Sequence, residues 1–113
     1  MQGDFILVIQ KAGMGSAPDP LPIQLLGKYL ALIHQNHLLP QAICFYTEGV
    51  KLVCEGSPVM KELLSLEQRG VHLIVCSTCL DFYGLREKVK VGIIGGMPDI
   101  IEAQTKASRV IVL

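Results

Sequence analysis

Three short runs of apolar residues limit the possible folds of this chain more than any other feature. The runs at 5–9, 42–46 and 71–75 are rich in β-branched or aromatic side chains and contain no Lys, Arg, Asp or Glu. Such a continuous run is typical of a strand buried on both faces, as in a parallel sheet. Apolar residues recur at helical spacing within 21–33, after Asp19-Pro20, and within 59–66. Strands that alternate with helices predict βαβ units, with a mainly parallel sheet and helices on both faces.

The pattern is less regular towards the end of the chain. Residues 80–83 and 85–89 predict helical turns, 91–94 a fourth strand, 97–107 a last helix and 110–113 a fifth strand. Segment 51–54 fits either a short strand or coil, and Ser57-Pro58 predicts an N-cap followed by Pro at the first helical position. We therefore expect one domain, 1–113, that folds as a three-layer α/β sandwich with a mainly parallel five-stranded sheet.

The composition narrows the classes of function. Half of the residues are hydrophobic and 18% are charged, so we expect both a buried sheet and a surface that is covered in a homo-oligomer. Ten basic residues balance ten acidic ones, which gives no electrostatic reason to expect binding to nucleic acid or membrane. The start of the chain lacks the features of a signal peptide, and no run approaches the ~20 apolar residues of a membrane span. We expect a cytoplasmic protein whose four cysteines are reduced.

The segment Cys76-Ser77-Thr78-Cys79 is the chemical centre of the sequence. Open parallel sheets form their sites beyond the carboxyl ends of the strands, so loops 11–20, 47–56, 76–84 and 95–98 should share one rim. A helix that starts just after Cys76 would stabilise its thiolate through unpaired N–H groups. A thiolate is the form that attacks a persulfide and accepts its outer sulfur. Cys79, one helical turn later, would lie on the same face and either resolve, share or tune this chemistry.

The cysteines also fit a structural role or a metal-binding role. Both thiols would also fit a buried core, where cysteine behaves as a small hydrophobe. Structural zinc would need Cys44, Cys54 and His72 to join the pair, and the sequence has no second Cys-x-x-Cys, so we expect no metal and no cofactor. Asp81 is expected to cap a turn beside the thiols, and His34 and His37 are expected on the first helix.

Glycine-rich loops surround the cysteine pair on the predicted rim. Gly13-Met14-Gly15-Ser16 has backbone N–H groups that could hold an anion, but it lacks the third glycine and the downstream acid of a dinucleotide fingerprint. Loop 47–56 brings Cys54 to the same rim. We expect the walls of a pocket beside the thiols to be formed by Gly13, Gly15, Ser16, Gly49, Cys54 and Met97.

Segments 45–57, 66–71 and 76–84 together resemble the DsrE/DsrF-like family of sulfur-trafficking proteins. Within that family the chain is most similar to the DsrE-like domain of YedF-type proteins, which are sulfurtransferase-like and linked to selenium metabolism. The resemblance implies a DsrE/YchN-like fold and homo-oligomers such as dimers, trimers or hexamers. In the sulfur-relay members, a cysteine just after strand three receives persulfide sulfur and precedes a glycine by eight residues. Cys76 and Gly84 match that spacing.

The resemblance therefore implies a sulfur carrier or sulfurtransferase with Cys76 as the acceptor and Cys79 as its accessory. YedF-type chains commonly carry an N-terminal TusA-like domain with a Cys-Pro dipeptide, which these 113 residues lack. We therefore expect a separate donor or acceptor protein, of TusA-like type. Two alternatives stand beside this hypothesis: a non-enzymatic oligomeric binding module of the same fold, and a Cys76–Cys79 dithiol redox switch.

Overall fold

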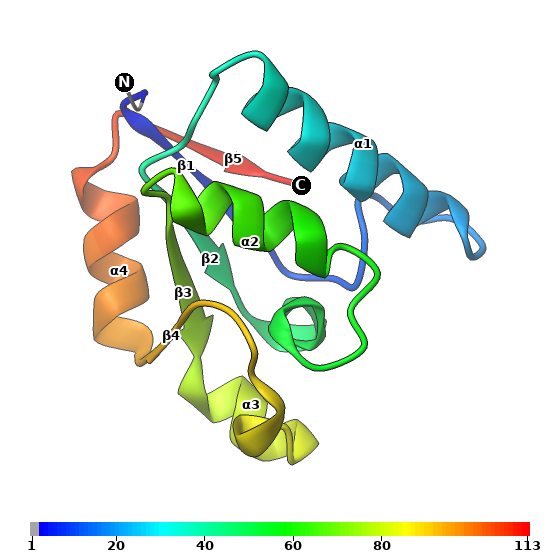
Figure 1. Ribbon diagram of the computed structural model, residues 1–113. Helices are drawn as coiled ribbons and strands as arrows, with labels where there is room; N and C mark the ends of the chain where they lie inside the picture. Colours follow the sequence, from blue (N-terminus) through cyan, green and yellow to red (C-terminus); the bar gives the residue numbers. More distant parts are fainter. Residues whose placement is uncertain (1–2) are drawn as a thin grey trace.

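The computed structural model describes residues 3–113, which form five strands, four α-helices and two 3₁₀ helices (Figure 1). The elements follow the predicted order. The strands are β1 (Phe5–Ile9), β2 (Ala42–Phe45), β3 (His72–Cys76), β4 (Ile93–Gly95) and β5 (Arg109–Val112). The α-helices are α1 (Leu21–Gln35), α2 (Met60–Gln68), α3 (Ser77–Tyr83) and α4 (Met97–Lys106), and the 3₁₀ helices are η1 (Thr47–Val53) and η2 (Arg86–Lys88).

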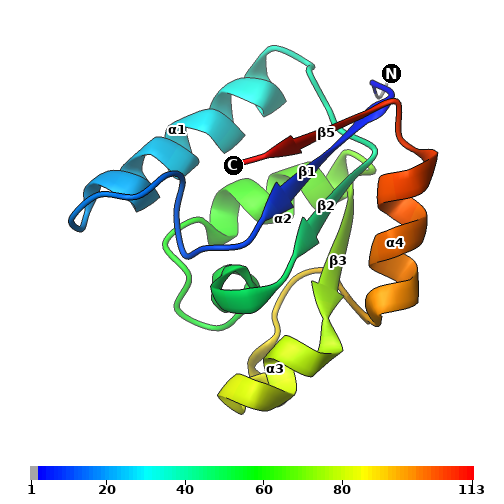
Figure 2. The same cartoon turned by 180° about the vertical axis from the view of Figure 1, so that it is seen from behind.

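The sheet has the strand order β4-β3-β2-β1-β5, and every neighbouring pair is parallel. From β1 to β4 the chain steps across the sheet in one direction, and right-handed connections place α1 and α2 on one face. The return from β4 to β5 runs the other way, so the same handedness places α4 on the opposite face (Figures 1 and 2). The predicted three-layer α/β sandwich with a parallel five-stranded sheet is confirmed.

The core lies mainly between the sheet and the α1–α2 layer. All five residues of β1 are buried, because β1 lies between β2 and β5 and is covered on both faces. Helix α1 buries Leu26, Leu30 and Ile33, whose spacing puts them on one stripe. Helix α2 buries Leu63 and Leu66. The apolar periodicity of the sequence thus marks the faces that pack on the sheet.

The carboxyl ends of β1, β2, β3 and β4 lie at one edge of the sheet, because these strands are parallel. The four loops assigned to one rim therefore start from that edge, as predicted. Figure 2 shows η1 and α3 below the ends of β2 and β3. No helix among residues 3–113 is both long and apolar enough to cross a bilayer.

Three local predictions are wrong. Helix α2 begins at Met60 rather than at Pro58, because the Ser57 hydroxyl accepts the Val59 N–H at 3.2 Å and closes a turn before the helix. Residues 51–53 are neither strand nor coil, since they belong to η1, and Cys54 forms an isolated antiparallel bridge with Val89. His37 lies beyond the end of α1, with a backbone φ of 58°.

Candidate functional site

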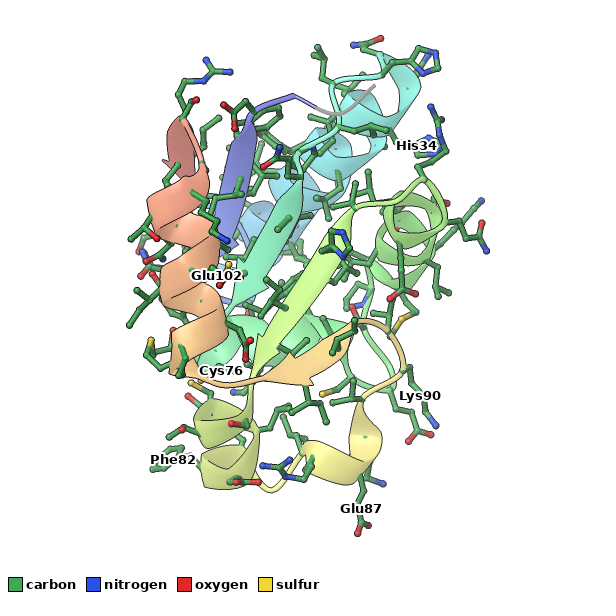
Figure 3. The ribbon with its side chains drawn as sticks, turned by 90° about the vertical axis from the view of Figure 1, so that its left-hand side faces the viewer. His34, Cys76, Phe82, Glu87, Lys90 and Glu102 are labelled. Carbon is green, nitrogen blue, oxygen red and sulfur yellow. The ribbon has the colours of Figure 1, made fainter. Side chains whose placement is uncertain are left out.

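Cys76 is the last residue of β3 and the N-cap of α3, so no loop separates the strand from the helix. It pairs with Gly95 on β4, and α4 begins two residues later. Figure 3 shows Cys76 where the end of the sheet, the start of α4 and α3 meet. The predicted position at a strand end and helix start is therefore present. Cys76 is only 1% exposed, as the alternative of buried core thiols predicted for this residue.

Cys79 lies one turn further along α3 and is the more accessible thiol of the pair. Its sulfur accepts the backbone N–H of Thr47 at 3.1 Å. The pKa of the Cys79 thiol is raised, first by burial and then by its hydrogen bond with Cys76, while the Thr47 N–H acts in the opposite direction. Cys79 therefore keeps its proton and can donate it to the sulfur of Cys76.

Thr47 is the site residue that the sequence analysis missed. It is the first residue of η1, two residues after the end of β2, and its hydroxyl donates to the backbone oxygen of Gln10 at 2.5 Å, just beyond the end of β1. Its backbone φ is 47°, in the left-handed region that β-branched residues avoid. Nothing in the local sequence signals this conformation, because the partners are 32 and 37 residues away.

The other two cysteines are embedded in the structure. Cys54 is buried, and its thiol donates to the Val50 carbonyl oxygen at 3.3 Å, with the Leu85 carbonyl oxygen at 4.0 Å. Burial raises the pKa of Cys54, and it raises that of Cys44, on β2, to about 11. Cys44 lies within the sheet and Cys54 is held by backbone carbonyls, so the candidate thiols are Cys76 and Cys79 at the start of α3.

The residues predicted as pocket walls are spread along the rim. Gly13, Gly15 and Ser16 line a shallow hollow of about 230 Å³ that also includes Glu48 but no cysteine. Gly49 is pressed against the end of β1, where an added Cβ would lie 2.0 Å from the carbonyl oxygen of Ile9. Met97 opens α4 and is 51% exposed. Of these segments, η1 contacts the thiol pair, through the Thr47 N–H and the Cys79 sulfur. The loop with Gly13, Gly15 and Ser16 lines a separate hollow.

Charged groups near α3 pair with one another rather than with the thiols. The Asp81 carboxylate receives two hydrogen bonds from Arg86, at 2.8 and 2.9 Å, and this guanidinium lowers the pKa of Asp81. The prediction that Asp81 caps a turn is therefore wrong: its side chain binds Arg86 across the end of the helix. Lys51 lies 4.6 Å from the centre of the Tyr83 ring.

A second hollow, of about 430 Å³, lies between α4 and the amino-terminal half of β3. Apolar residues of the sheet form its floor, and Glu102 points across this face (Figure 3). Within residues 3–113, no three His, Cys, Asp or Glu side chains group as a metal site would require.

Comparison with known proteins gives a consistent result. A sequence model described as the DsrE/DsrF-like family matches residues 14–113. No curated protein matches the chain. The crystal structure of the ychN protein from E. coli aligns with a TM-score of 0.74 and 18% identity over 100% of both chains.

Two further solved structures align over nearly their full length. One is a protein of unknown function from Methanobacterium thermoautotrophicum, with a TM-score of 0.70 and 18% identity over 96% of this chain and 97% of that one. The other is a conserved protein of unknown function from Bacteroides thetaiotaomicron, with a TM-score of 0.67 and 16% identity over 97% and 95%. At these identities the likeness shows a common fold.

Proposed function

Because this chain belongs to the DsrE/DsrF-like family, whose members are generally sulfur-relay proteins, we propose that it carries sulfur as a persulfide on Cys76. The observation that carries the proposal is the Cys76–Cys79 thiol pair at the start of α3, on the carboxyl rim of the parallel sheet. Ligands and substrates of open α/β sheets bind at this rim.

The transfer is a thiol exchange without net oxidation. The Cys76 thiolate attacks the outer sulfur of a donor persulfide, the new S–S bond forms at Cys76, and the donor S–S bond breaks. The donor leaves as a thiolate and takes up a proton. Attack by an acceptor thiolate on the outer sulfur reverses these changes and returns Cys76 to a thiolate. Transfer of selenium would follow the same bond changes.

Cys79 supports this exchange as a hydrogen-bond donor. Its raised pKa keeps the proton on its sulfur, and its hydrogen bond with Cys76 stabilises negative charge there, both before attack and when Cys76 leaves. Cys76 is only 1% exposed, whereas Cys79 is partly exposed. A donor therefore reaches Cys76 only after the structure opens on the side where Cys79 lies.

A partner protein supplies or accepts the sulfur in this proposal, and a TusA-like carrier has suitable chemistry. The surface next to the site favours such docking. Phe82, on α3, is 83% exposed and points away from the helix (Figure 3), and Met97 at the start of α4 is half exposed. Exposed aromatic and methionine side chains are enriched at protein interfaces. The cytoplasm, where thiols stay reduced, is the compartment that suits this chemistry.

We also propose a homo-oligomer, supported by apolar side chains on the two edge strands and on α4. Ile93 on β4 is 66% exposed, Val112 on β5 is 54% exposed, and Ile101 on α4 is half exposed. An isolated exposed apolar residue needs no explanation, but exposed edge strands with apolar side chains favour association.

A dithiol redox switch is the second candidate, favoured by the contact between the Cys76 and Cys79 thiols. Oxidation would join the two sulfurs and release two electrons and two protons to a disulfide or another thiol oxidant. The resulting disulfide is distinguishable by mass from a persulfide.

The experiment is incubation of the reduced protein with a small persulfide donor, followed by intact mass spectrometry. We expect an adduct of ~32 Da that is lost in Cys76→Ser and kept in Cys79→Ser. Cys54→Ser is the matched control, because its thiol has only backbone partners, and it should keep the adduct. An adduct that survives in Cys76→Ser would contradict the assignment. A loss of ~2 Da that requires both Cys76 and Cys79 would support the redox switch instead.

A further inference from the structure

Thr47 adopts a backbone conformation that its side chain disfavours. Its φ of 47° lies in the left-handed region, where a β-branched residue is a clear outlier. Thr47 is exposed, so packing of its side chain in the core does not force this conformation. Strain of this kind persists only where neighbouring contacts maintain it, and it is concentrated at functional sites.

The hydroxyl of Thr47 and the packing of nearby Gly49 hold this turn in place. The hydroxyl donates to the Gln10 carbonyl oxygen at 2.5 Å and also lies 2.7 Å from the carbonyl oxygen of Tyr46, so one proton serves either acceptor. Gly49 packs directly against the Ile9 carbonyl, which brings the start of η1 to the end of β1. The hydroxyl of Thr47 thus ties the end of β2 to the end of β1.

The conformation directs the Thr47 N–H at the Cys79 sulfur, 3.1 Å away. Because the Cys79 sulfur accepts this N–H, the proton of the Cys79 thiol is free to point in another direction. Cys79 also shares a hydrogen bond with Cys76. The contacts therefore form a chain from the Thr47 N–H to the Cys79 sulfur and on to Cys76.

We propose that Thr47 is a positioning residue for the thiol pair: its hydroxyl locks the left-handed backbone, so that its N–H fixes Cys79 in the orientation that serves Cys76. The benefit to sulfur transfer rests on the proposed function. The lock itself concerns only the reactivity of Cys79 and can be tested without any sulfur donor.

The test measures the rate at which iodoacetamide alkylates Cys79 as a function of pH, with peptide-resolved mass spectrometry as the readout. All variants carry Cys76→Ser, so that only one thiol of the pair titrates. Thr47→Val and Thr47→Ala remove the hydroxyl, and Thr47→Ser retains it. Because the N–H stabilises the Cys79 thiolate, both hydroxyl-free variants should shift the profile to higher pH. We expect alkylation about fivefold slower on the rising part of the profile, the effect of one typical hydrogen bond. Thr47→Ser should match the parent.

A merely structural role would lower the thermal stability of the variants and leave the pH profile of Cys79 in place. Unchanged profiles in Thr47→Val and Thr47→Ala, with folding checked by circular dichroism, would overturn the proposal. A shift of equal size in Thr47→Ser would also overturn it, because the hydroxyl would then not be the lock. Failure of persulfide formation on Cys76 would leave these outcomes unaffected, so the two proposals fail separately.

Discussion

Replacing Gly49 with alanine should destabilise the protein strongly, because η1 and the end of β1 touch at this residue. An alanine Cβ would lie 2.0 Å from the Ile9 carbonyl oxygen and 2.8 Å from the Ile9 carbonyl carbon, so the backbone must move by about 1 Å to restore ordinary contact. The Ile9 oxygen accepts the Tyr46 N–H at 3.2 Å and cannot turn aside without losing that bond. Overpacking typically costs ~1–3 kcal/mol and a lost hydrogen bond ~1 kcal/mol. We expect a loss of about 3 kcal/mol, out of a total stability on the order of 5–15 kcal/mol.

The assay is urea unfolding followed by far-ultraviolet circular dichroism, with Gly27→Ala as the matched control. Gly27 lies inside α1, and its added Cβ would have Val59 Cγ1 as its nearest neighbour, at a comfortable 3.8 Å. The same substitution should therefore stabilise the protein there, by up to about 1 kcal/mol, through helix propensity. A Gly49→Ala protein with an unchanged urea midpoint, or one that shifts like Gly27→Ala, would refute the argument from close contact.

Three further predictions concern the buried thiol, the docking surface and the oligomer. Burial raises the pKa of Cys44 from 9.0 to about 11. As the pH rises, the thiol therefore loses its proton in the unfolded chain before it does so in the folded one. The stability that this thiol contributes below pH 9 is thus lost as the pH rises towards 11. Over this pH range, the free energy of unfolding measured with urea should fall by up to about 2 kcal/mol more in the wild type than in Cys44→Ala. Equal losses in the two proteins would contradict this prediction. Phe82→Ala should change the unfolding free energy by less than about 0.5 kcal/mol, yet slow persulfide formation from a protein donor and not from a small donor; equal rates with both donors would count against docking at Phe82. Ile93→Asp and Val112→Asp should each reduce the mass measured by sedimentation, and an unchanged mass for both would exclude these edges as the interface.

The layers and strand order could be predicted because local patterns determine them. The run Phe5–Ile9 is apolar at every position, since β1 lies inside the sheet and is covered on both faces. Right-handed connections and parallel pairing then put the end of β3 on the carboxyl rim. That is why the sequence alone could locate Cys76 at a strand end that leads into a helix.

The finer geometry of the site depends on contacts between distant segments, which local patterns do not encode. The left-handed backbone of Thr47 is held by Gln10, 37 residues away, and its N–H meets Cys79, 32 residues away. The partner of Asp81, Arg86, is only five residues away, but it takes up its position only because the chain turns after Gly84. The sequence predicts Gly49 as a wall of the pocket. Only the packing of η1 against the end of β1 explains why this position requires a glycine.

In the sulfur transfer that we propose, the position of Cys76 meets two opposing demands. A persulfide must be shielded from other thiols, and yet its outer sulfur must reach a partner. The backbone of Cys76 is fixed by its pairing with Gly95, and its side chain is buried. On its other side lies α3, seven residues long, which buries only Leu80 and ends at Gly84 with a φ of 66°. Segments with few buried contacts open at the lowest free-energy cost, so α3 could uncover the sulfur while the sheet stays intact. Cys54 has no comparable arrangement, because its thiol is held between η1 and the Leu85 carbonyl. A thiol at the junction of a fixed strand and a short helix is therefore the one that we propose for guarded transfer.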